Sequence, residues 1–214
     1  MITIKRFVCN MLQENTYVLS DETREAVIID CGALYDEERA AIVGYIKENQ
    51  LKPVHLLCTH GHFDHNFGND TIWREFGLKP EVAAEDEWLM DIKAQVRQMI
   101  GTDYQHEVPP VGRLLSAGDV ITFGSHQLAV MATPGHTRGS VTFYCEAEKA
   151  AFTGDTLFQM SIGRTDFESG SPAEMAVSLR QLSALPADTA VYAGHGNPTT
   201  IGDEVRHNPY MIAF

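Results

Sequence analysis

The stretch THGHFDH, residues 59–65, decides the fold of this chain. It comes directly after the apolar run Val54–Cys58, which is typical of a buried strand. Its metal-binding side chains, three imidazoles and one carboxylate, are His60, His62, Asp64 and His65. Neutral imidazole nitrogen and carboxylate oxygen are the donors that zinc and similar divalent ions prefer. The spacing therefore predicts a metal site on this loop rather than a chance cluster of surface histidines.

Three shorter motifs place more polar side chains after apolar runs. PGHT (134–137) follows the run 127–132, GDTLF (154–158) follows 150–153, and GHG (194–196) follows 190–193; they supply His136, Asp155 and His195. Taken alone, each is better explained as a turn residue that caps a helix or bonds to backbone. Together with the first loop they make five imidazoles and two carboxylates. That set is enough for two metal ions and too many for one.

The order of elements predicts an α+β fold made of two halves. Strands are expected at 2–8, 16–19, 26–29 and 54–58, with helices at 36–49 and 69–76; a second series of strands at 120–123, 127–132, 140–145 and 150–153 precedes a helix at 173–185 and a strand at 190–193. Strands followed by a helix, twice over, favour a layered sandwich over a doubly wound parallel sheet. We expect one domain over residues 1–214.

Between the two halves, residues 84–100 are predicted to be helical and 102–118 to be a loop, the best candidate for a mobile flap. The large apolar side chains of 88–100 are expected to pack in the core or the flap rather than to form a substrate pocket. They are Trp88, Leu89, Met90, Ile92, Val96, Met99 and Ile100.

Composition excludes several classes of function. The chain has 214 residues, with 16 Lys and Arg against 29 Asp and Glu, for a formal charge of −13. Such an acidic chain without a basic cluster is a poor partner for nucleic acid or anionic membranes. The four cysteines lie far apart without a CxxC pair, which predicts buried thiols and a reducing, cytoplasmic location.

THGHFDH, PGHT, GDTLF and GHG, in this order over essentially the whole chain, resemble the motifs of the metallo-β-lactamase superfamily, and in particular its short glyoxalase II-like hydrolases. The resemblance implies a four-layer αβ/βα sandwich with a dinuclear site where the sheets meet. It implies that His60, His62 and His136 bind one ion, that Asp64, His65 and His195 bind the other, and that Asp155 bridges them. Asp30 matches a position that supports the ligands from behind; the alternative is a simple turn residue.

The resemblance also implies a reaction, hydrolysis of a small thioester such as S-lactoylglutathione. Two divalent ions about 3.5–4 Å apart generate hydroxide from a shared water at neutral pH. Asp64 and Asp155 are the expected catalytic carboxylates, because Asp64 could also hold the hydroxide and take its proton. A thiolate, whose conjugate acid has a pKa of about 8.5, leaves without a general acid. Zn²⁺ is the first expectation for both ions, although the same donors suit iron and manganese.

Substrate recognition is where the chain departs from the glutathione-specific enzymes. Arg164 stands where they place a basic residue against glutathione, so Arg164 and Asp166 are candidate substrate-binding residues; alternatively Arg164 pairs with Asp166 or Glu168 to fix the loop. Those enzymes place an aromatic residue near the position of Asp166 and another after the GHG-type histidine, where this chain has Gly196-Asn197-Pro198.

Several other readings of the sequence stay open. On the same scaffold, a persulfide dioxygenase would use one iron, a lactonase or β-lactamase would act on a different acyl bond, and a non-catalytic module would only bind metal. The expected partner is a small-molecule thioester, with no nucleic acid and no membrane. The expected assembly is a monomer or a small homo-oligomer.

Overall fold

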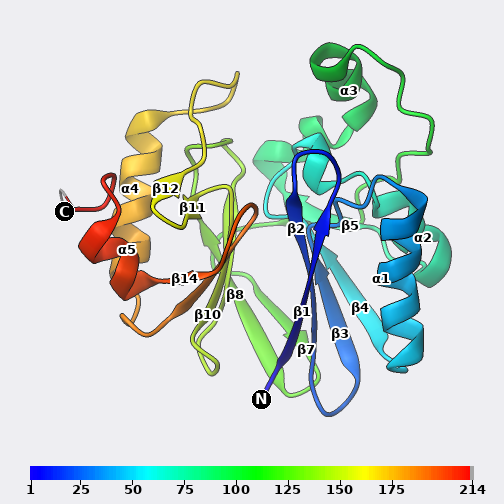
Figure 1. Ribbon diagram of the computed structural model, residues 1–214, viewed down its shortest axis with the longest axis horizontal. Helices are drawn as coiled ribbons and strands as arrows, with labels where there is room; N and C mark the ends of the chain where they lie inside the picture. Colours follow the sequence, from blue (N-terminus) through cyan, green and yellow to red (C-terminus); the bar gives the residue numbers. More distant parts are fainter. Residues whose placement is uncertain (213–214) are drawn as a thin grey trace.

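The computed structural model describes residues 1–212, which form two six-stranded mixed sheets face to face (Figure 1). The first sheet has the order β1 (Thr3–Cys9), β2 (Glu14–Ser20), β3 (Glu25–Ile29), β4 (Lys52–Leu57), β5 (Pro80–Ala83), β6 (Arg113–Leu115). The second has the order β14 (Thr199–Thr200), β13 (Ala190–Ala193), β10 (Ala150–Gly154), β9 (Val141–Cys145), β8 (His126–Ala132), β7 (Val120–Phe123). A small hairpin, β11 (Leu157–Phe158) and β12 (Ser161–Ile162), follows β10.

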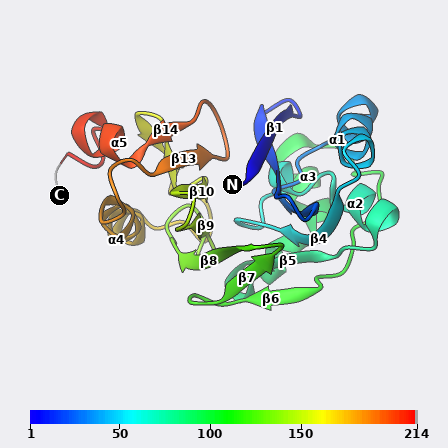
Figure 2. The same ribbon diagram turned by 90° about the horizontal axis from the view of Figure 1, so that it is seen from below.

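Helices cover the outer face of each sheet. α1 (Asp36–Glu48) and α2 (Asn69–Phe76) flank the first sheet, and α4 (Pro172–Ser183) and α5 (Ile201–His207) flank the second (Figures 1 and 2). The predicted αβ/βα sandwich is therefore confirmed. Within residues 1–212, none of the helices combines the length and apolarity needed to cross a bilayer. The single domain predicted over 1–214 stays a prediction, and its last two residues lie outside the described part of the chain.

Alternation along the strands explains the layers. In β3, Val27 and Ile29 join the core between the sheets, together with Phe143 of β9 and Phe152 of β10. Ala26 and Ile28 of β3 point the other way and pack with Ile42 and Ile46 of α1. Successive side chains of a strand point to opposite faces, so both faces of this strand are buried and its sequence is continuously apolar.

The structure differs from the predicted elements mainly between the two halves of the chain. The stretch 84–100 divides at Asp91 into the 3-10 helix η2 (Ala84–Met90) and α3 (Ile92–Ile100), and the predicted loop 102–118 contains β6. The strands β5, β11, β12 and β14 and the helix α5 were not predicted either. β5 and β6 are short, with four and three residues, and each pairs in parallel with a strand far along the chain. A strand of three or four residues is too short to show a clear alternation of apolar and polar residues in the sequence.

The strands bring several loops to one edge of the sandwich. β3 and β4 run parallel, as do β10 and β13, and β8 has the same direction as β10 because β9 pairs antiparallel with both. Two backbone hydrogen bonds join the sheets at this edge: Val141 N donates to Thr59 O at 2.8 Å, and Asn15 N donates to Gly194 O at 2.7 Å. The loops after β4, β8, β10 and β13 therefore meet at the same place.

Candidate metal centre

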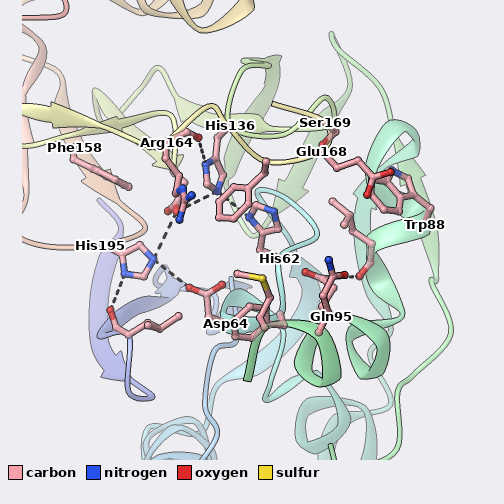
Figure 3. A pocket seen from close by; sticks show the side chains of 18 residues that line it. His62, Asp64, Trp88, Gln95, His136, Phe158, Arg164, Glu168, Ser169 and His195 are labelled. Carbon is pink, nitrogen blue, oxygen red and sulfur yellow. Dashed lines mark hydrogen bonds and ion pairs between the residues drawn. The ribbon is translucent and has the colours of Figure 1, made fainter. Parts of the chain in front are cut away.

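All seven predicted ligands come together at this edge, in two groups joined by one carboxylate. Figure 3 labels His62, Asp64, His136 and His195 among them. In the first group, donor atoms of His60, His62 and His136 lie within 4.8 Å of one another. Nδ1 of His62 is 2.8 Å from Nε2 of His136. Imidazole nitrogens this close either share a proton or share a cation.

The second group consists of Asp64, His65 and His195, whose donor atoms also lie within 4.8 Å of one another. Nε2 of His195 is 3.3 Å from Oδ2 of Asp64 and 3.3 Å from Nε2 of His65. Nε2 of His65 is 3.7 Å from Oδ2 of Asp64. Two nitrogens and a carboxylate oxygen thus converge, as zinc or iron would require.

Asp155 lies between the groups and reaches both. Its Oδ1 is 3.3 Å from Nε2 of His65, and its Oδ2 is 3.4 Å from Nε2 of His136 and 3.7 Å from Nε2 of His195. The loop that follows β13 can approach it only because residue 194 is glycine: a Cβ there would lie 2.3 Å from Oδ1 of Asp155. A carboxylate in this position can bind one ion through each oxygen.

The buried polar atoms and the charges of the site fit metal ions. His60 is fully buried, and its Nε2 has no hydrogen-bond partner, although buried polar atoms normally have one. Burial lowers the pKa of His60 well below its usual value and that of His62 to about 3, so both are neutral imidazoles with a free electron pair. Burial alone would raise the pKa of Asp155, but His65 and the other imidazoles hold it well below its usual value. Neutral nitrogen donors at His60 and His62 thus lie beside an ionised carboxylate. Burial alone would lower the pKa of His65 and His195, but the carboxylates of Asp155 and Asp64 raise both, so a metal ion would take the place of a proton on these two imidazoles.

Second nitrogens of the candidate ligands are held from behind. Nδ1 of His136 lies 2.8 Å from the carbonyl oxygen of Arg164, and Nδ1 of His195 lies 3.1 Å from that of Leu12. Nδ1 of His60 lies 3.0 Å from Oγ1 of Thr59. Such partners fix the orientation and tautomer of a ligating imidazole.

Asp30 lies directly behind His65. Its Oδ2 is 3.0 Å from Nδ1 of His65 and accepts a hydrogen bond of 2.7 Å from the hydroxyl of Thr59, while Oδ1 accepts one of 2.7 Å from the Thr59 amide. The chain turns here with φ of 52°. Asp30 therefore combines the two alternatives predicted for it: it lies at a turn of the chain, and it supports the candidate ligand His65.

Two buried carboxylates next to the site were not predicted. Asp86, in η2, accepts hydrogen bonds from the Gly61 and Gly139 amides and from the hydroxyl of Thr137, at 2.9, 2.8 and 2.7 Å. Glu14 is fully buried, with Oε1 4.0 Å from Nδ1 of His65, and burial raises its pKa well above its usual value. Neither stands in a recognisable motif, and an acidic residue in a sequence is more often solvent-exposed.

A cavity of about 530 Å³ opens onto the two groups. Five of the seven candidate ligands line it, whereas His60 and His65 lie behind them. Trp88 and Met99 also line it with exposed side chains, so the prediction that they belong to core or flap packing was wrong. Leu89 lines it too, but its side chain is buried as predicted. For Met90, Ile92 and Val96 the same prediction was right, because these side chains are buried.

Arg164 takes the second of its two predicted arrangements. Its Nε and Nη2 donate to the two carboxylate oxygens of Asp166 at 2.7 and 2.8 Å, and its guanidinium lies 4.3 Å from the ring centroid of Phe167. Arg164 lines the cavity, but Asp166 is not among the lining residues. The cation at the cavity is therefore already paired.

Sequence comparison identifies similar proteins over nearly the whole chain. A family model described as "Metallo-beta-lactamase superfamily" matches residues 9–195. The chain is 37% identical to an uncharacterized protein of Mycobacterium leprae (strain TN), covering 97% of this chain and 98% of the other. It is 34% identical to hydroxyacylglutathione hydrolase GloC of Haemophilus influenzae, covering 93% of both chains.

Solved structures share the fold and cover similar lengths. The structure titled BLEG-1 B3 metallo-beta-lactamase has a TM-score of 0.90 at 34% identity, over 98% of this chain and 99% of the other. TTHA1623 in a di-iron-bound form has a TM-score of 0.85 at 32% identity, over 96% and 99%. ETHE1 from Myxococcus xanthus has a TM-score of 0.78 at 28% identity, over 97% and 83%.

Proposed function

The chain belongs to the metallo-beta-lactamase superfamily, and from this premise we propose that it is a glyoxalase II-type enzyme that hydrolyses a small-molecule thioester with two divalent metal ions. Superfamily and relatives indicate a metal-dependent hydrolase. The observation that carries the proposal is the pair of three-donor groups joined by Asp155 at the floor of an open cavity. The similarity to the relative named hydroxyacylglutathione hydrolase GloC supports a thioester as the substrate.

In this proposal, His60, His62 and His136 hold one ion, Asp64, His65 and His195 hold the other, and Asp155 binds both. Bound ions would lower the pKa of a water between them and polarise the acyl oxygen of the substrate. Asp64 lies at the cavity surface and is suited to accept the proton of the attacking water. Burial alone would raise the pKa of Asp64, but His65 and His195 lower it, so the carboxylate is ionised and able to do so.

The bond changes need no further acid from the chain. Water oxygen adds to the thioester carbon, the C–S bond breaks, and the sulfur leaves as a thiolate with a conjugate-acid pKa of about 8.5. The second proton of the water passes from the product carboxyl to the thiolate, and Asp64 releases the first to solvent, so the products are a carboxylate and a thiol. His60 and His65 do not line the cavity, so they would hold the ions without touching the substrate.

We propose Zn²⁺ for both ions, with iron or manganese as alternatives, because imidazole and carboxylate suit all three. The similarity to TTHA1623, solved in a di-iron-bound form, supports iron as an alternative metal. A one-iron persulfide dioxygenase is the second candidate reaction, and the similarity to the protein named ETHE1 supports keeping it. The complete second group favours two ions over one.

The test begins with metal analysis of protein purified without added metal. The same sample is then assayed for thiol release from S-lactoylglutathione and other thioesters, for oxygen uptake with glutathione persulfide, and for hydrolysis of a lactone and a β-lactam. Two ions with thiol release support the proposal. One iron with oxygen uptake, or no thiol release after zinc is restored, would overturn it.

A matched pair of variants ties the result to the site. His62→Ala removes a candidate ligand, so metal content and thiol release should both fall. His207→Ala removes an exposed imidazole at the end of α5, outside the two groups, and should change neither. If His62→Ala retained full activity, the chain would not use this centre.

A further inference from the structure

The wall of the cavity away from the candidate ligands is mainly apolar. Leu12 comes from the β1–β2 turn, Trp88 from η2, Met99 from α3 and Phe158 from β11. The other apolar side chains of the wall are Phe63, Leu89 and Phe167, and its neutral polar ones are Gln95, Gln98 and Ser169. Trp88 is 55% exposed, Met99 54% and Leu12 49%, although large apolar side chains are usually buried. Three such side chains from separate segments around one opening mark a binding surface rather than scattered exposure.

Charge at the cavity is nearly absent outside the candidate ligands. Of its lining residues in the described chain, only Arg164 and Glu168 are charged beyond those in the two groups and Asp155. Arg164 already binds Asp166 through both carboxylate oxygens. Glutathione carries two carboxylates and one ammonium. Outside the candidate ligands these would meet one cation already paired with Asp166, one like charge, the neutral polar side chains of Gln95, Gln98 and Ser169, and otherwise apolar carbon. Burying charges without partners is costly.

We propose that the preferred thioester is uncharged and carries an alkyl or aryl group that fills this cavity. The inference rests on the proposed thioester hydrolysis and names its substrate class. A volume of about 530 Å³ lies within the range of pockets, roughly 300–1,000 Å³, that enclose a medium-sized organic molecule. The apolar group lies beside Trp88 and Met99, while the reacting carbon lies between Asp64 and Asp155.

The proposal predicts a dependence on chain length. Each methylene that moves from water into an apolar wall contributes a factor of about 2–4 to kcat/KM. A series of thioesters of N-acetylcysteamine, a small neutral thiol, with acetyl, butanoyl, hexanoyl and phenylacetyl groups measures this factor. A parallel series of S-acetyl esters of alkyl and aryl thiols places the apolar group on the other side of sulfur. S-lactoylglutathione provides the charged comparison.

Exposed positions offer a matched pair of variants. Met99→Glu places a carboxylate at the cavity mouth, and Val177→Glu makes the same change on α4, where the side chain is 63% exposed and outside the cavity. Because both side chains are largely exposed, we expect both variants to fold. Met99→Glu should lower kcat/KM for the hexanoyl ester about 10-fold and for the acetyl ester much less. Val177→Glu should change neither value.

The outcomes separate the two proposals. A rise of kcat/KM with apolar size in either series, above the value for S-lactoylglutathione, supports the inference. A higher value for S-lactoylglutathione than for every neutral ester, or no rise with size, overturns it and leaves thioester hydrolysis intact. No thiol release from any ester overturns the proposed function and the inference with it.

Discussion

Arg164 shows how one neighbour changes what a side chain can do. A guanidinium beside a cavity would bind a substrate carboxylate, but here both carboxylate oxygens of Asp166 occupy it. The pair is 60% and 68% exposed, so it contributes little to stability. Its effect is on the charge that the cavity presents.

Asp166→Asn should therefore free Arg164 for an anionic ligand. We expect KM for S-lactoylglutathione to fall about 2- to 5-fold, since an exposed charge pair is worth up to about 1 kcal/mol. The value of kcat should stay the same, because Asp166 does not line the cavity. Steady-state kinetics measures both constants. A lower kcat with unchanged KM would instead assign Asp166 to the reaction.

Asp155→Asn tests the carboxylate between the two groups. The amide keeps the shape of the side chain but replaces one anionic oxygen with a nitrogen that has no electron pair to donate. We expect at least one ion to be lost and turnover to fall about 100-fold or more. Metal analysis and kcat provide the measurements, with Asp188→Asn, an exposed carboxylate paired with Lys149, as the control. Full metal content in the variant would exclude the bridging role.

At the scale of elements, η2 connects the cavity wall to the loops of the candidate ligands. Trp88 and Leu89 of η2 line the cavity, while Asp86 of the same helix accepts hydrogen bonds from both Gly61 and Gly139. These two glycines belong to the loops that carry His62 and His136. One short helix thus contributes to the substrate cavity and holds two ligand loops together.

Asp86→Ala removes an acceptor from three buried donors. An unsatisfied buried group costs about 1–3 kcal/mol, so the free energy of unfolding should fall by several kcal/mol. Metal affinity should also fall, because the loops after β4 and β8 lose their common anchor. Denaturant unfolding and zinc titration measure the two effects, with the exposed neighbour Glu85→Ala as the control. If the variant bound its full complement of zinc with the same affinity as the unchanged protein, Asp86 would contribute only to the stability of the fold.

At the scale of the whole molecule, the sheets are joined at both ends. Opposite the candidate metal centre, Asp21 follows β2 and accepts hydrogen bonds from the amide and hydroxyl of Ser125, at 2.7 and 2.9 Å, with Nδ1 of His126 at 3.0 Å. Nε2 of His126 is 3.0 Å from Glu148. His126 is buried and occupies a polar junction between the sheets.

This junction gives stability a dependence on pH. Burial would raise the pKa of Asp21, but hydrogen bonds from Thr23, Ser125 and His126 outweigh it and hold the pKa below its usual value. A lowered pKa in the folded state means that the contribution is complete above the unfolded value of about 4 and is lost as the pH falls further. The free energy of unfolding of Asp21→Asn at pH 7 should be lower by about 1–3 kcal/mol than that of the unchanged protein. It should also decrease less when the pH is lowered. Denaturant unfolding of both proteins at pH 7 and pH 3 tests this. If the free energy of unfolding fell equally between these pH values in the variant and in the unchanged protein, the prediction would be contradicted.

Metal removal should act on the whole fold as well. The candidate ligands come from both sheets, so ions held between them add their binding free energy to folding. We expect a chelator to lower Tm and added zinc to restore it, as measured by thermal unfolding. A Tm unchanged by either treatment would show that these side chains do not hold ions.

Local patterns were sufficient for the layers and for the candidate ligands. Strand alternation and capping act over a few residues, so β3, α1 and β7 were predicted within about two residues of their bounds. His60, His136 and His195 each follow a strand that ends at the same sheet edge. Recognisable motifs therefore coincided with spatial proximity.

The sequence by itself determined the two sheet-and-helix halves and the seven side chains that meet between them, because each depends on short-range periodicity and on the ends of strands. Only the tertiary structure decided the parallel pairing of β5 and β6, the anchoring by Asp86 and the apolar wall around Trp88 and Met99. These features depend on which distant segments face one another. A periodic pattern shows which side of a helix is apolar, but whether that side faces the core or a cavity is set by the packing of the whole chain.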